Sequence, residues 1–142
     1  MRNTIKRILK ESIKDKIINQ IDKLGLYAFM KMSGMSYPKI FSIAGNDWIT
    51  NKVMIDFIKD DIKDNGVFSV HEIGYDPILY GKTNDEYREI SYFSKNYVYV
   101  DVYSGNNNLG DFKVMYENLS DNILKECFDL VMDAYEEGVF GE

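Results

Sequence analysis

Residues 92 to 103 read Tyr92-Phe93-Ser94-Lys95-Asn96-Tyr97-Val98-Tyr99-Val100-Asp101-Val102-Tyr103, and they are the most strand-like run in this chain of 142 residues. From Tyr97 onward, valine alternates with tyrosine or aspartate. Successive side chains of a strand point to opposite faces, so the valines share one face and Tyr97, Tyr99, Asp101 and Tyr103 share the other. The pattern predicts a central strand whose valines contact a layer of helices and whose tyrosines lie on the opposite face of the sheet.

The composition is that of a globular protein. Hydrophobic residues make up 45% of the chain, and it contains only 2 prolines and 10 glycines, which argues against disorder. A chain of this length is expected to form a single domain. No apolar run approaches the roughly 20 residues of a membrane span, so we expect a soluble protein made in the cytoplasm, without membrane contact.

The charge is unevenly distributed along the chain. Residues 1–24 carry seven Lys or Arg against three Asp or Glu, a net charge of +4, whereas the rest carries ten against twenty, a net charge of -10. Neutralisation of phosphates supplies most of the affinity for nucleic acid, so an acidic body disfavours nucleic acid as the partner. We expect a protein partner or self-association instead.

Residues 2–24 have the composition of a helix, but their apolar positions do not form a straight stripe. An apolar residue recurs every four positions, and at about 100° per residue the stripe drifts by roughly 40° at each step; the positions are Ile5, Leu9, Ile13, Ile17 and Ile21. We therefore predict a break at Ser12, with Ser12 as the N-cap of a second helix. Residues 1–11 then form a separate basic leader, and residues 12–142 form one domain.

The rest of the chain divides into short helices, then strands, then one helix. The predicted helices are residues 26–33, residues 39–44, and a third that begins at residue 47 or residue 50 and ends at residue 64; each is followed closely by a glycine. The apolar period then changes from 3.6 to 2, and the predicted strands are residues 67–73, 78–80, 87–93, 97–103 and 112–116. Ser120 and Gly138 bound a closing helix. This order predicts a two-layer α+β fold: N-terminal helices, an antiparallel sheet of four to five strands, and a C-terminal helix packed on the sheet.

His71 is the only histidine, so any general base or metal site built on imidazole requires it. It falls in the predicted strand 67–73, and the nearby carboxylates that could orient it are Glu72, Asp76 and Asp101. A small enzyme built on these groups is the alternative function. It requires a concave pocket that contains His71 and at least one of the three carboxylates.

No other pattern of catalytic or metal-binding residues occurs. Cys127 is the only cysteine, so it has no internal disulfide partner, and it falls on the apolar face of the closing helix, which predicts a buried thiol. Asp60, Asp61 and Asp64 lie near a helix end, as expected of a solvated surface. The loop 104–111 is rich in oxygen atoms but lacks the residue order of a calcium-binding loop, which favours a hairpin loop. We predict neither a metal nor a cofactor.

Two groups of residues are candidates for a protein contact. Tyr97, Tyr99 and Tyr103 form one, joined by Tyr87 or Tyr92 of the neighbouring strand according to the register. Tyrosine is frequent at interfaces because it combines a large apolar ring with a polar tip. Unless a second helix covers it, this row is a contact surface. The other group contains Met30 and Met35, in a methionine-rich helical region that forms either an adaptable binding surface or core packing.

The first residues of the chain carry a resemblance. The run Met1-Arg2-Asn3-Thr4-Ile5-Lys6-Arg7-Ile8-Leu9-Lys10-Glu11-Ser12 resembles the basic amphipathic leaders of small uncharacterised proteins of tailed phages. Leu9-Lys10-Glu11 before Ser12 also resembles the site cut by prohead proteases of T-even-like phages, whose internal head proteins carry a capsid-targeting peptide of this length. The resemblance implies a virion protein cut between Glu11 and Ser12. An ordinary amphipathic helix with a lysine-rich solvent side accounts for the same residues.

These observations favour a non-catalytic protein over an enzyme. The expected function is that of a protein-interaction or virion-associated protein, phage-derived, whose acidic body binds a protein partner in the host cytoplasm or in the virion. The contact surface is expected at the tyrosine row or at the methionine-rich helices. The enzyme based on His71 remains the alternative.

Overall fold

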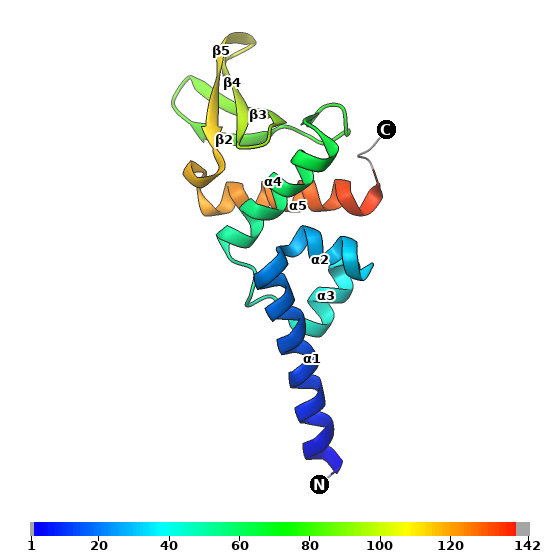
Figure 1. Ribbon diagram of the computed structural model, residues 1–142. Helices are drawn as coiled ribbons and strands as arrows, with labels where there is room; N and C mark the ends of the chain where they lie inside the picture. Colours follow the sequence, from blue (N-terminus) through cyan, green and yellow to red (C-terminus); the bar gives the residue numbers. More distant parts are fainter. Residues whose placement is uncertain (1, 139–142) are drawn as a thin grey trace.

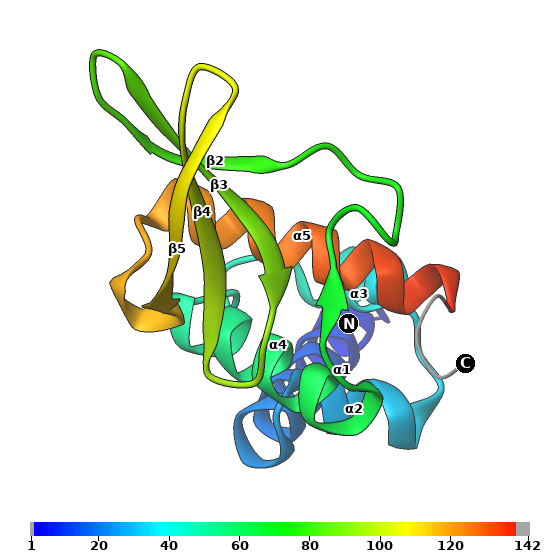
Figure 2. The same ribbon diagram turned by 90° about the horizontal axis from the view of Figure 1, so that it is seen from above.

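The computed structural model describes residues 2–138, with side chains from residue 13 onward (Figures 1 and 2). The helices are α1 (Arg2–Leu24), α2 (Leu26–Ser33), α3 (Tyr37–Ala44), α4 (Asn51–Asn65) and α5 (Asp121–Glu137). The strands are β1 (Phe68–Ser69), β2 (Ile78–Lys82), β3 (Glu86–Phe93), β4 (Tyr97–Ser104) and β5 (Asn107–Met115), and a 3₁₀ turn (Tyr116–Asn118) leads into α5. The predicted α+β order is confirmed.

The sheet packs on helices with one face. Its strands are all antiparallel in the order β1-β3-β4-β5, and β2 pairs with the same edge of β3 as β1 does. Figure 1 shows α4 and α5 beneath the sheet, and α1, α2 and α3 on the far side of α4 and α5. The predicted layers are therefore present, and the N-terminal helices extend the helical layer away from the sheet.

The core extends from the sheet past α4 and α5 to α1, α2 and α3. Val98 and Val100 of β4 are fully buried, as their alternation predicted, and they lie opposite Phe93 and Ile90 of β3. Below them the ring of Phe57 on α4 meets three other rings edge to face, with centroids 5.5 to 5.9 Å apart; these belong to Tyr27, Phe128 and Tyr135. Rings from α2, α4 and α5 thus join the helices into one core.

Side-chain caps and glycines bound the helices, although α3 begins at Tyr37, two residues before its predicted start at residue 39. Ser36, Thr50 and Ser120 each accept a hydrogen bond from the backbone amide three residues later, which satisfies a donor that has no partner within the helix. Gly34 and Gly138 end α2 and α5 in the left-handed conformation, each with a φ of 70°. The boundaries of α2 and α5 are therefore predicted to within one residue by local chemistry, and of the two predicted starts of α4 the one at Thr50 is correct.

The break predicted at Ser12 is wrong, because α1 is one continuous helix from Arg2 to Leu24. Only its C-terminal half packs on α2 and α3, through Ile17 and Ile21, whereas Ile13 is 51% exposed. The other half extends away from the rest of the molecule (Figure 1). A helix that docks along half its length does not need a straight apolar stripe. Removal of residues 1–11 stays a prediction.

Two strands also differ from the prediction by more than two residues at one end. β1 ends at Ser69 rather than continuing to residue 73, because the chain turns there: the backbone N–H of Gly74 donates to the carbonyl of His71 at 3.1 Å. β5 begins at Asn107, so most of the predicted loop 104–111 is strand. Residues 107–113 are all exposed and show no apolar alternation, and their pairing with β4 carries the strand.

Candidate functional site

The face of the sheet opposite the buried valines is not covered by any element of residues 2–138. Figures 1 and 2 show helices on only one side of the sheet. The uncovered side, here termed the tyrosine face, carries five partly exposed tyrosines: Tyr87, Tyr92, Tyr97, Tyr99 and Tyr103. No helix of residues 2–138 therefore covers this row as core, and its role as a contact surface stays a prediction.

Cross-strand pairing holds four of these tyrosines in two stacked pairs. The rings of Tyr87 and Tyr103 lie 5.3 Å apart, with 15° between their planes. Those of Tyr92 and Tyr99 lie 4.1 Å apart, with 17° between their planes. Tyr97 meets the ring of Tyr99 edge to face at 5.3 Å. Rings held by their neighbours lose little conformational entropy when a partner binds, which suits a contact surface.

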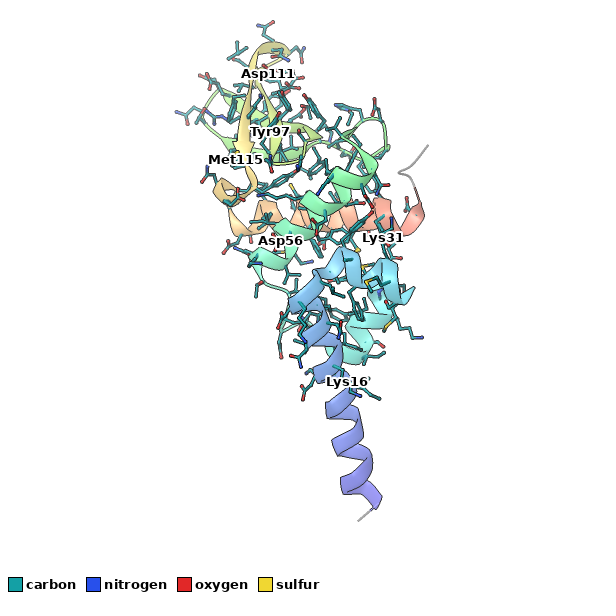
Figure 3. All side chains as sticks on the ribbon, viewed as in Figure 1. Lys16, Lys31, Asp56, Tyr97, Asp111 and Met115 are labelled. Carbon is teal, nitrogen blue, oxygen red and sulfur yellow. The ribbon has the colours of Figure 1, made fainter. Side chains whose placement is uncertain are left out.

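A cation already contacts these rings within the chain. Nζ of Lys113 on β5 lies 4.7 Å from the ring centroid of Tyr97 and 5.6 Å from that of Tyr99. Attraction between an ammonium group and an aromatic face is worth about 0.5 to 1 kcal/mol at an exposed site. Figure 3 shows Tyr97 at the sheet end of the molecule, together with Asp111 and Met115 of β5.

Between the two stacked pairs lies an acidic row, formed by Glu89, Asp101 and Asp111. Glu89 of β3 pairs with Asp101 of β4, and Asp101 pairs with Asp111 of β5, so the three are directly opposite one another across the strands. None of the four ion pairs found in the described residues involves them. Partial burial, and then the charge of Asp111, raise the pKa of Asp101, while the charge of His71 lowers it. Like charges in such positions destabilise a sheet.

Sequence reasoning found Asp101 but missed the other two members of the row. β3 is irregular between Ile90 and Tyr92, where its register with β4 shifts by one residue. Simple alternation along β3 therefore does not show that Glu89 and Tyr92 share a face. Asp111 was missed because the strand containing it was expected to begin at residue 112. The alternation of β4 is the only signal that pointed toward this surface.

His71 lines none of the grooves described for residues 13–138, so the pocket that the enzyme alternative requires is not seen there. It is exposed in the turn after β1, where its backbone N–H donates to Oγ of Ser69 at 3.2 Å. Asp76 lies elsewhere, in a groove of about 610 Å³ between the segment leading into β2 and α5, and His71 does not line that groove. The enclosed imidazole expected of a general base is therefore not formed.

The methionine-rich contact surface is also not formed as expected. Met30 is only 2% exposed and belongs to the core. Met35 is half-buried and packs against the same core. Met32 is 75% exposed, but it stands without the other two. Core packing is the role of this region, and the tyrosine face remains as the candidate contact surface.

The carboxyls at the end of α4 are not all solvated, which corrects the sequence interpretation. Asp61 is fully buried. Its Oδ1 accepts a hydrogen bond from Nδ2 of Asn65 at 2.6 Å, whereas its Oδ2 has no hydrogen-bond partner among the described residues. Burial raises the pKa of Asp61 to about 6. The side chain faces the interior because its position on the helix adjoins those of Phe57 and Ile58.

Cys127 is buried, as its place on the apolar face of α5 predicted. Burial raises the pKa of its thiol to about 12, so the thiolate is scarce at neutral pH. We expect Ellman's reagent to leave the folded protein unmodified and to react with one thiol per chain once denaturant unfolds it. Rapid reaction of the folded protein would contradict the burial of this side chain.

In the described part of the chain, no group of three His, Cys, Asp or Glu residues is placed to hold a metal ion. Among residues 2–138, no helix combines the length and the apolarity needed to cross a membrane. Comparison of the chain with protein-family models, with curated protein sequences and with solved structures gives no match.

Proposed function

We propose that this chain is a non-catalytic, phage-derived interaction protein that binds a protein partner through the tyrosine face. The observation that supports this is the set of five partly exposed tyrosines, four of them in stacked pairs, on a sheet face that no described element covers. Interfaces are enriched in tyrosine because its ring offers contact area at low entropic cost.

The phage origin rests on the resemblance of residues 1–12, and it has its own test. The specific form of the proposal is an internal virion protein that is packaged through residues 1–11 and cut between Glu11 and Ser12. Mass spectrometry of the protein taken from virions should find Ser12 as the first residue. Recovery of an intact N-terminus would contradict this form and would leave the tyrosine face unaffected.

Replacement of both Tyr92 and Tyr99 with alanine is expected to abolish capture of the partner. The pair stacks at 4.1 Å, so the double change removes both rings from the centre of the face. Loss of a central aromatic contact typically weakens binding by tenfold or more. Pull-down from a host lysate, with recovery of the partner compared between the variant and the unchanged protein, is the measurement.

The matched control is Phe41→Ala. This aromatic residue is 44% exposed, and it lies on α3, in the helices on the far side of α4 and α5 from the sheet. The control should capture the partner as well as the unchanged protein does. Circular dichroism of each variant establishes that it is folded. Equal capture by the double variant and the control would count against the proposed function.

A further inference from the structure

We infer that the segment of the partner that binds the tyrosine face is rich in arginine and that its guanidinium groups lie over the acidic row. This inference rests on the proposed function and specifies the chemistry of the partner. Three features of the face carry it: an acidic row without ion pairs, the parallel rings on both sides of that row, and a cation already held by the rings.

The acidic row has no ion-pair partner among the described residues, and the charge of His71 is the one favourable charge found near Asp101. Glu89, Asp101 and Asp111 face one another directly across three strands, and no described Lys or Arg forms an ion pair with any of them. Lys113 lies in the next row of the same face, where it contacts tyrosine rings instead. A positively charged partner would relieve the repulsion, so charge complementarity favours a basic segment.

The flanking rings favour arginine over lysine. A guanidinium group is planar, donates to a carboxylate through two parallel hydrogen bonds, and stacks on an aromatic face, whereas an ammonium group is a compact point charge. The rows of the face are two residues apart along the strands, roughly 7 Å. A guanidinium over the acidic row therefore has a tyrosine pair within reach on either side. Alternate side chains of an extended segment have the same spacing of roughly 7 Å.

Two other occupants are disfavoured by charge and by placement. A nucleic-acid strand would bring phosphates to a row of carboxylates. In a second copy, the segment with a net positive charge is residues 1–24, which carry seven of the 17 Lys and Arg, and the free end of α1 lies at the opposite end of the molecule from the sheet (Figure 1). Docking of that end on the tyrosine face of another copy would be head to tail, and it would build assemblies that grow with concentration.

The test uses a fluorescently labelled peptide with arginine at alternate positions and serine between them, and a second peptide with lysine in place of arginine. Fluorescence anisotropy at low and at high salt measures binding to the full chain. We expect the arginine peptide to bind, the lysine peptide to bind several-fold more weakly, and salt to weaken both. The double variant Glu89→Gln/Asp101→Asn should weaken binding of the arginine peptide by about tenfold or more.

A charge-matched control separates the acidic row from the general acidity of the chain. The double variant Asp76→Asn/Asp133→Asn removes two negative charges from exposed side chains of the groove along α5. It has the same net charge as the acidic-row variant and should bind the arginine peptide like the unchanged protein. Equal weakening by both variants, or no weakening by the acidic-row variant, would overturn the inference.

Three further outcomes are decisive. If light scattering at low salt shows a mass that rises with concentration and that falls back in the acidic-row variant, the occupant is a second copy and the inference is overturned. If the Tyr92 and Tyr99 double variant loses the partner in the lysate assay while the acidic-row variant retains it, the proposed function stands and the arginine inference falls. If both variants retain the partner, both fail.

Discussion

Replacement of Phe57 with alanine is expected to lower the free energy of unfolding by about 3 to 5 kcal/mol. Phe57 is fully buried on α4, and its ring contacts those of Tyr27, Phe128 and Tyr135. The change removes buried apolar area and leaves a cavity that rings from α2 and α5 fill only in part. Because single domains are stable by only about 5 to 15 kcal/mol, this one change should remove a large share of the total.

Urea denaturation followed by circular dichroism measures this effect, and Phe41→Ala serves as the control. The control removes the same atoms from a side chain that is 44% exposed, so it should cost less than about 1 kcal/mol. The two midpoints should differ widely at similar slopes. If both variants lost the same small amount of stability, the aromatic cluster would not be the centre of the core.

The second large effect is the dependence of stability on pH through Asp61. Burial raises the pKa of Asp61 from 3.8 to about 6 in the folded state, so its ionised form is disfavoured there. The stability that the neutral group contributes is fully present below about pH 4, and it is lost as the pH rises through about 6. A shift of this size corresponds to roughly 3 kcal/mol of unfolding free energy. The loss is complete at pH 7.

Asp61→Asn should therefore stabilise the protein at pH 7 and not at pH 4. The expected gain at pH 7 is about 1 to 2 kcal/mol, less than the full cost of the charge, because the new amide nitrogen needs an acceptor of its own. Denaturation at both pH values measures the difference. Asp47→Asn changes an exposed carboxyl and should have little effect at either pH. A gain of equal size at both pH values would exclude ionisation of Asp61 as the cause.

The sequence predicted what local chemistry decides. Ser120 and Gly138 bound α5 as expected, and the alternation from Tyr97 placed Val98 and Val100 in the core. It could not predict burial that depends on the packing of distant elements. Asp61 belongs to a charged run that is typical of a surface, yet its position on α4 turns it inward. Whether α1 continues as one helix through Ser12 likewise depends on how much of it contacts the rest of the molecule, which the sequence does not show.

The candidate site could be predicted only in its central strand. Tyr97, Tyr99, Asp101 and Tyr103 were placed on one face by their spacing in β4, and the structure keeps them there. Which residues of β3 and β5 share this face depends on the register of those strands with β4, and a single sequence does not determine that register. Met30 was wrong as a contact residue because its buried position follows from the docking of α2 on α4.

The irregularity in β3 places both tyrosines of that strand on the tyrosine face. An odd number of positions separates Tyr87 from Tyr92, so an unbroken strand would send these two rings to opposite sides of the sheet. Ser91 is the extra residue, and the alternation of side chains changes faces there. Tyr87 and Glu89 before it and Tyr92 after it lie on the tyrosine face, while Phe93 lies in the core. Oγ of Ser91 donates to the carbonyl of Tyr99 at 3.3 Å. This hydrogen bond links the inserted residue to β4, the strand whose Tyr99 stacks on Tyr92. Because of this one inserted residue, the tyrosines of β3 lie on the same face of the sheet, and its buried apolar side chains lie together on the other face.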